Sequence, residues 1–119
     1  EGLGMSPRRI TVSTAGIAKM IKKLADDASK VNLALSLHAA DDTKRNEIMP
    51  INEQNDLAAL MEALDYYYRT TQNRISYEYI AFQDFNEGLD DAANLYKLCR
   101  RFPVRVNIIE YNPIIPNNI

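Results

Sequence analysis

Only one of the 119 residues is a cysteine, Cys99, and this scarcity excludes two kinds of site. A single thiol cannot form a disulfide within the chain, nor can it supply the several thiolates of an all-cysteine metal cluster. Long apolar runs are missing as well. None approaches the roughly 18 residues that a membrane-spanning helix needs, so no membrane partner is expected. No basic segment followed by an apolar one opens the chain, and the cytoplasm is therefore the expected location.

Positive charge is not in excess either, because 14 lysines and arginines stand against 16 aspartates and glutamates. Proteins that bind nucleic acid usually carry a basic stripe, since the release of counterions from phosphates supplies most of their affinity. The composition thus argues mildly against RNA binding by this chain alone. The length suits one domain. Because the first residue is Glu1 rather than methionine, we expect the chain to be a piece of a longer polypeptide.

Four short runs are predicted to be strands, because each is rich in β-branched, aromatic or leucine residues and is bounded by turn or capping residues. They are Arg9 to Thr14, Val31 to His38, Arg74 to Phe82 and Arg105 to Asn112. Apolar residues at helical spacing predict helices between them. The predicted stripes are Ile17, Met20, Ile21 and Leu24; then Leu57, Leu60, Met61, Leu64 and Tyr68, with Asn55 as N-cap; then Leu89, Ala92, Ala93, Tyr96 and Cys99. A shorter helix is predicted over Asp42 to Ile48.

Strands that alternate with helices in this way indicate an α/β fold of parallel βα units with right-handed crossovers. Side chains alternate between the two faces of a strand, so the second strand has an apolar face and a small, polar one. Such a strand suits the wall of a βα barrel, with helices outside and a ligand near the carboxyl ends of the strands. Four polar residues are predicted to lie at those ends: Ser13, Ser36, His38 and Asn112.

These strand ends sit within stretches that together resemble one family. The stretch from Arg8 to Gly16 (RRITVSTAG) resembles its RR-[VI]-T-[LV]-ST-x-G segment, and Ser36 to Asn52 resembles its SLHA-x-x-D…R…PIN segment. Glu78-Tyr79 and Tyr111-Asn112-Pro113 are similar to its E-Y and x-N-P motifs, in the same order. On these residues the chain is identified as a member of the RlmN/Cfr family, the radical S-adenosylmethionine methyltransferases that modify an adenine carbon of 23S ribosomal RNA.

The resemblance implies that residues 1–119 are the carboxyl-terminal part of a radical S-adenosylmethionine barrel, contributing about four strands to a partial (βα)6 barrel. It implies that S-adenosylmethionine is contacted by Ser13, Ser36, Leu37, His38 and Asn112. It also implies a parent enzyme that methylates adenine, at carbon 2 in the RlmN branch and carbon 8 in the Cfr branch. The RNA partners implied are 23S rRNA and, for RlmN, tRNA; carbon 2 is the expected position.

Other parts that the resemblance implies are not in this chain. Family members bind a [4Fe–4S] cluster through a CxxxCxxC loop, for which thiolates are the expected ligands. A second cysteine site carries the methyl group to RNA, and Cys99 matches neither motif. The family's Gly-Glu cofactor loop and its accessory RNA-binding domain are absent too. We therefore expect the chain alone to be inactive, with no catalytic residue and no metal ligand. Its open sheet edges are expected to favour self-association.

The residues alone leave other interpretations open. Ser13 is a plausible helix cap, a lone histidine such as His38 is usually structural, and Asn112 before proline is a common turn opener. A βα-barrel lyase or aldolase could use Glu78, Glu110 and His38 for acid–base chemistry. A non-catalytic βα interaction module is a further alternative.

Overall fold

The computed structural model describes residues 10–27 and 30–111, and within them strands and helices alternate along the chain. The order is β1 (Ile10–Thr14), α1 (Ala18–Asp26), β2 (Val31–Ser36), α2 (Asp42–Ile48), the 3₁₀ turn η1 (Pro50–Glu53), α3 (Leu57–Thr71), β3 (Ile75–Ala81), α4 (Leu89–Leu98) and β4 (Arg105–Glu110). The predicted helix over Asp42 to Ile48 is confirmed at both ends. Each predicted strand is present, although three of them end earlier than expected. For Asn112, the predicted end of the last strand, the structure gives no description.

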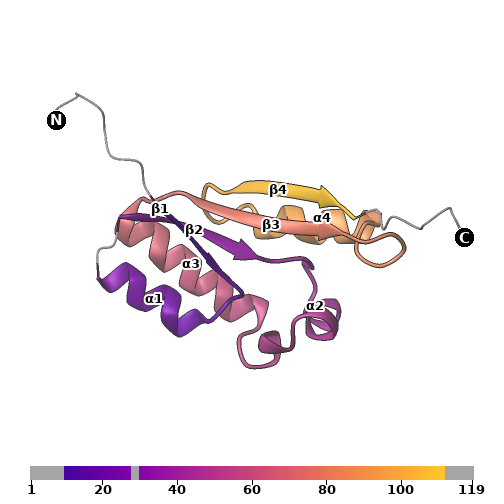
Figure 1. The fold of residues 1–119 in the computed structure, drawn as a ribbon, viewed down its shortest axis with the longest axis horizontal. Helices are drawn as coiled ribbons and strands as arrows, with labels where there is room; N and C mark the ends of the chain where they lie inside the picture. The colour runs from indigo at the N-terminus through magenta and orange to yellow at the C-terminus, as the bar shows by residue number, and fades with distance from the viewer. Residues whose placement is uncertain (1–9, 28–29, 112–119) are drawn as a thin grey trace, which may run out of the picture.

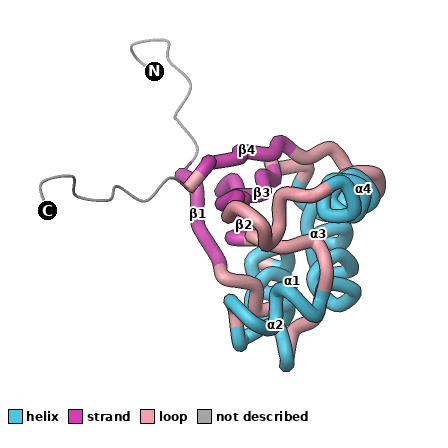
Figure 2. The backbone as a smooth tube through the Cα atoms, turned by 90° about the vertical axis from the view of Figure 1, so that its right-hand side faces the viewer, coloured by secondary structure: helices cyan, strands magenta, loops and turns pink. Residues whose placement is uncertain are grey.

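All four strands are parallel and follow their chain order, β1-β2-β3-β4, in one sheet (Figure 1). Each strand is therefore joined to its neighbour by a crossover connection. The α/β class and the four-stranded parallel wall predicted from the sequence are confirmed. Figure 2 shows the helices gathered on one side of the strands. One face of the sheet is thus packed, and the described residues leave the other face open.

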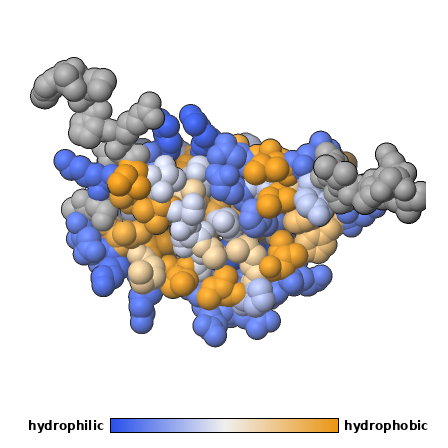
Figure 3. Space-filling view, in the orientation of Figure 1, coloured by the Kyte–Doolittle hydropathy of each residue, from blue (hydrophilic) through white to orange (hydrophobic). Residues whose placement is uncertain are grey.

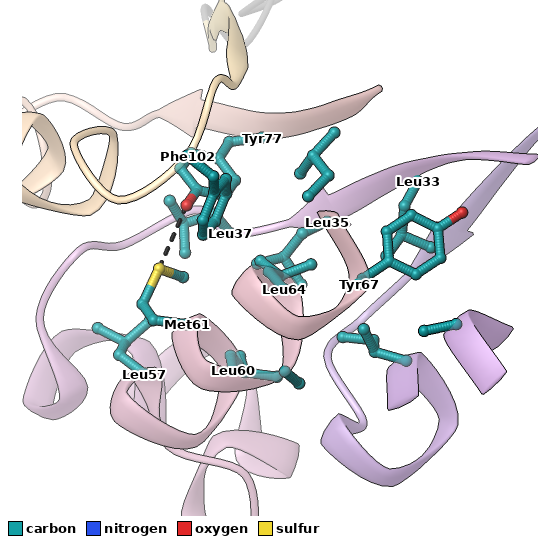
Figure 4. Close-up of a cluster of buried hydrophobic side chains, with 14 of the residues drawn as sticks. Leu33, Leu35, Leu37, Leu57, Leu60, Met61, Leu64, Tyr67, Tyr77 and Phe102 are labelled. Atoms are coloured by element: carbon teal, nitrogen blue, oxygen red, sulfur yellow. Dashed lines mark hydrogen bonds between the residues drawn. The ribbon is translucent and has the colours of Figure 1, made fainter. Parts of the chain in front are cut away.

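The packed face follows from the alternation of side chains along β2. Leu33, Leu35 and Leu37 are fully buried beneath α3, whose Leu60 and Leu64 are also fully buried (Figure 4). Burying a leucine side chain completely contributes about 1.5–3 kcal/mol. The Tyr77 ring of β3 joins this cluster, and its hydroxyl donates to the Leu98 carbonyl at 2.8 Å and lies 3.2 Å from the Met61 sulfur. The hydroxyl therefore has partners although its ring is buried.

The predicted apolar stripe of α4 was wrong except at Cys99, which packs against the core as expected. Leu89 is 91% exposed and Tyr96 66% exposed, whereas the face toward the sheet carries Asp91, Leu95 and Leu98. A carboxylate is buried here because it has two partners. Asp91 accepts from Lys44 Nζ at 2.7 Å and from the Gly88 backbone N–H at 3.0 Å. A buried charge that is paired and hydrogen-bonded is tolerated, and neither partner can be inferred from the periodicity of the helix.

The start of α1 also departs from the prediction. Of the predicted stripe, Ile17 is 41% exposed and Met20 52% exposed, whereas Ile21 is buried and Leu24 packs against the core as predicted. Ala25, which the stripe omitted, is buried as well, and α1 packs against α3. Asn55 does not cap α3, whose N-cap is Asp56. The Asn55 side chain instead accepts from the Ala18 N–H at 2.9 Å, so it satisfies an unpaired donor in the first turn of α1. Ser13 lies in β1 and caps no helix.

The edge strands expose apolar side chains. Ile10 of β1 is 70% exposed, and Ile108 and Ile109 of β4 are 61% and 53% exposed. The space-filling view shows apolar patches among the polar side chains on the face of the molecule seen in Figure 1 (Figure 3). Among the described residues, no helix combines the length and the apolar character that crossing a bilayer requires.

Candidate functional site

The open face of the sheet is lined with small and polar side chains. Ser13 of β1 lies opposite Ala34 in the register, so it shares a face with Ser36, two residues further along β2. Glu78 of β3 lies opposite Ser36 and extends this face. Within residues 10–27 and 30–111, neither serine hydroxyl has a side-chain hydrogen bond. Both hydroxyls are therefore available to donate to a ligand and to accept from it.

His38 lies beyond the end of β2, not within it as predicted. Its φ of 58° places it in the left-handed region, which a residue other than glycine rarely adopts. The turn brings the imidazole back to β3, where Nδ1 accepts from the Ile80 N–H at 3.0 Å. An Nδ1 that accepts a hydrogen bond carries no proton, so in the neutral ring the proton is on Nε2. The side chain thus presents one fixed N–H donor at the rim of the sheet, just beyond the carboxyl end of β2.

The environment of His38 favours the neutral ring. Burial lowers its pKa below the ordinary value, and the nearby positive charge of Arg45 lowers it further, while Glu78 acts in the opposite direction. The Ile80 N–H has the same effect, because it points at an Nδ1 that protonation would turn into a second donor. A neutral His38 is therefore part of the folded structure near pH 7.

We expect the free energy of unfolding to fall as the pH drops below about 6.5, the pKa of an unperturbed histidine. Below this pH the unfolded chain binds a proton at His38 more readily than the folded chain does, so acid favours unfolding. Above this pH His38 is neutral in both states, and its full contribution to the stability is present. One proton limits the slope to about 1.4 kcal/mol per pH unit. Urea unfolding from about pH 7.5 to 5.5 measures it. His38→Gln keeps an acceptor but removes the titration. Equal pH dependence of the two proteins would contradict this prediction.

A buried arginine holds the ends of β1 and β2 together. Arg45 of α2 is 0% exposed and donates from Nε to the Leu37 carbonyl at 2.9 Å. Its Nη2 donates to the carbonyls of Ser36 at 2.9 Å and Ala15 at 2.7 Å. Burial lowers the pKa of Arg45 to about 10, so the guanidinium stays charged at neutral pH. These bonds lock the backbone from which the Ser36 and His38 side chains project.

The remaining donor of Arg45 extends this hydrogen-bond network toward α3. Nη1 donates to Asn52 Oδ1 at 2.8 Å, and the Asn52 amide donates to Asp42 Oδ1 at 2.9 Å and to Asn46 Oδ1 at 2.8 Å. The same Asp42 oxygen accepts from the Leu57 N–H at the start of α3. One network of side chains thus joins two strand ends, α2, η1 and α3.

The backbone of Leu37 is already used within the fold. Its N–H donates to the Glu78 carbonyl at 2.9 Å, and its carbonyl accepts from Arg45. A carbonyl has a second lone pair, so a ligand contact at Leu37 would use that lone pair or the peptide plane and not the N–H. Of the five cofactor positions inferred from the sequence, Ser36, Leu37 and His38 are consecutive, Ser13 shares the open face, and Asn112 lies outside the described residues.

Glu78 and Glu110 do not form an acid–base pair. Glu78 Oε2 accepts from the Asn107 amide at 2.7 Å. Glu110 lies opposite Ala81 in the register, on the other face of the sheet from Glu78. The pair that a lyase or aldolase would need is therefore divided between the two faces. Within the described residues, no group of three or more His, Cys, Asp or Glu side chains gathers as a metal site.

The sequence indicated no role for three buried polar side chains at the site, those of Arg45, Asn52 and Asn86. They are 0%, 1% and 1% exposed. Arg45 and Asn52 fall within the matched SLHA-to-PIN stretch, so the resemblance was the only signal that pointed to them. Asn86 lies in a loop of turn-forming residues and gave no signal of its own.

Comparison with known proteins identifies many relatives. The chain is 55% identical over 118 residues to a probable dual-specificity RNA methyltransferase RlmN from Christiangramia forsetii, covering 99% of the chain and 34% of that protein. It is 52% identical over 114 residues to a protein with the same description from Flavobacterium psychrophilum, covering 96% and 33%. The family resemblance found in the sequence is thereby confirmed. No protein-family profile matches the chain.

A solved structure shares the fold. The crystal structure of a radical SAM methyltransferase from Sphaerobacter thermophilus superposes with a TM-score of 0.84 and 35% identity, over 93% of this chain and 33% of that one. The chain therefore spans about a third of the length of the proteins it matches.

Proposed function

We propose that this chain, a homologue of one third of the RlmN-family RNA methyltransferases, forms the carboxyl-terminal part of a radical S-adenosylmethionine barrel and one side of its cofactor site. The observation that carries the proposal is the rim at the end of β2. There Ser36 offers a hydroxyl and His38 a fixed N–H donor beside an open polar face. Residues 1–119 would then be one part of a larger catalytic domain.

The donors and acceptors of this rim fit the nucleoside part of S-adenosylmethionine. Hydroxyls such as those of Ser13 and Ser36 pair with ribose oxygens or a carboxylate, and the Nε2–H of His38 donates to a ring nitrogen or an oxygen. Asn112, with Leu37, completes the proposed set of contacts. When bound, this cofactor supplies the methyl group and the radical chemistry. The role that we propose for this chain is to hold and orient the cofactor.

The residues present do not fit the [4Fe–4S] cluster that the family requires. Cys99 is the one cysteine of the sequence, and it ends α4 partly buried against the core. Burial raises the pKa of its thiol, which disfavours the thiolate that iron binds. We therefore assign the cluster to another part of the parent enzyme and expect no methyl transfer from this chain alone.

The proposed reaction is methylation of an adenine carbon, with carbon 2 as the position and with 23S rRNA and tRNA as substrates. The dual-specificity description of the relatives supports two kinds of RNA substrate. The cytoplasm, where both RNAs are found, is the proposed location. Association of two chains through the open edges of β1 and β4 is proposed only for the isolated chain, because further strands would cover these edges in a complete barrel.

A segment exchange tests this proposal. The matching third of the Christiangramia forsetii relative is replaced by this chain, and nucleosides of 23S rRNA and tRNA from a host lacking its own enzyme are analysed by mass spectrometry. We expect 2-methyladenosine from the chimera and none from the chain alone. In the chimera, Ser36→Ala should weaken S-adenosylmethionine binding by roughly fivefold to tenfold, the effect of one lost hydrogen bond.

The matched control is Thr11→Ala, on the same open face but opposite Asn32, one level further from the rim than Ser13 and two further than Ser36. It should change cofactor binding little. A folded chimera that makes no methyladenosine would overturn the proposal, and 8-methyladenosine would move the chain to the Cfr branch.

A further inference from the structure

The amide of Asn86 closes a ring of hydrogen bonds around His38. Asn86 Nδ2 donates to the His38 carbonyl at 2.6 Å and to the Ile80 carbonyl at 2.8 Å. The Ile80 N–H in turn donates to His38 Nδ1 at 3.0 Å. His38 just beyond the end of β2, Ile80 in β3 and Asn86 in the loop before α4 are thus joined by hydrogen bonds. Ile80 bonds to both of the other residues.

Asn86 is itself held on its other sides. Its Oδ1 accepts from the Phe82 N–H at 2.6 Å, and its backbone carbonyl accepts from the buried Tyr79 hydroxyl at 2.6 Å. The side chain is 1% exposed, so water does not compete for these bonds. A fully satisfied buried network of this kind fixes one arrangement of its members.

We propose that Asn86 is a positioning residue that holds His38 in its left-handed backbone conformation and in its Nε2–H tautomer. The Asn86 amide donates to the His38 carbonyl and to the Ile80 carbonyl at the same time. It therefore sets the distance between the His38 backbone and the Ile80 N–H, which donates to the His38 ring. Without this tie, the unfavourable φ of 58° would relax and Nδ1 would lose its partner. Asn86 touches no ligand in this proposal; it acts through His38.

The consequence for recognition rests on the proposed function. Nδ1 is occupied, and Nε2 has no hydrogen-bond partner among the described residues. The ring can therefore only donate to a ligand at the rim, and the matching atom must be an acceptor, such as a purine ring nitrogen or a ribose oxygen. An amino group at that position would meet the Nε2–H and be rejected. Asn86 thereby contributes to the choice of ligand from outside the site.

Nuclear magnetic resonance on the chain itself tests the positioning, because His38 is the only histidine. In the unmodified chain, we expect imidazole nitrogen shifts of the Nε2–H tautomer, a coupling through the hydrogen bond between the Ile80 amide nitrogen and His38 Nδ1, and slow exchange of the Ile80 amide proton. Absence of that coupling together with fast exchange would overturn the proposal without any variant.

The variant Asn86→Asp removes the donor and adds one negative charge, while it keeps an acceptor for the Phe82 N–H. We expect mixed tautomer shifts at His38 and exchange of the Ile80 amide faster by roughly tenfold or more, since about one net hydrogen bond or more is lost. The matched control is Asn73→Asp, another buried asparagine, 3% exposed, at the amino end of β3. It should leave the His38 signals unchanged. A folded Asn86→Asp chain with unaltered His38 shifts would show that Asn86 is merely structural.

These measurements need no cofactor, so their failure is distinct from failure of the proposed function. If the segment exchange gives no methylation while the His38 signals behave as expected, the positioning stands and the assigned reaction falls.

Discussion

Replacing Arg45 by methionine should lower the free energy of unfolding by about 3–5 kcal/mol. Methionine keeps much of the length of the side chain but supplies none of the donors that Arg45 directs to Leu37, Ser36, Ala15 and Asn52. The Leu37 carbonyl and Asn52 Oδ1 would stay buried without this partner, and each such group is costly. Urea unfolding at neutral pH measures the loss.

The control for this substitution is Arg69→Met on α3. Arg69 is exposed and pairs with Asp65 at 3.3 Å, four residues earlier on the same helix. Such surface pairs contribute about 0.3–0.5 kcal/mol. If both variants unfolded at the same urea concentration, the Arg45 network would not hold the strand ends as we describe.

The second large effect is expected at Gly16, which follows β1. Its φ of +111° is strained for any residue with a side chain, and a Cβ would lie 3.0 Å from Leu60 Cδ1 and 3.1 Å from Arg45 Nη2. Backbone strain and overpacking each cost about 1–3 kcal/mol, so Gly16→Ala should destabilise the fold by about 2–6 kcal/mol. Thermal or urea unfolding of the variant measures this difference.

Gly88→Ala is the matched control, because Gly88 has an ordinary φ of −78° and the nearest atom to an added Cβ is an Asp91 oxygen at 3.4 Å. As the N-cap of α4, it should lose no more than about 1 kcal/mol. Combining Gly16→Ala with Leu60→Ala isolates one cause: the double variant relieves the contact with Leu60 but neither the strain nor the contact with Arg45. A Gly16→Ala protein as stable as Gly88→Ala would refute the close approach.

The success of the sequence analysis depended on how local each feature is. The alternation along Leu33, Leu35 and Leu37 predicted a strand with one packed face, and the structure confirms it. The stripe of α4 failed because Lys44, 47 residues away in sequence, makes it possible to bury Asp91. Asn55 was assigned to the helix that follows it but caps α1 across 37 residues.

The candidate site divides in the same way. Ser36, Leu37 and His38 are proposed for this site through the resemblance, because they form a contiguous stretch. The structural roles of Arg45 and Asn86, which hold these residues, were not predicted, because a buried polar side chain looks the same in sequence as an exposed one.

By itself, the sequence determined the parallel α/β class, the apolar face of the sheet and the family, since these follow from periodicity and short contiguous motifs. Only the tertiary structure decided the left-handed turn of His38, its tautomer and the burial of Arg45 and Asn86. The physical reason is that these features depend on hydrogen-bond partners brought together by the crossovers. The Ile80 N–H is 42 residues from His38 and Asn86 is 48, and no local pattern records such a pairing.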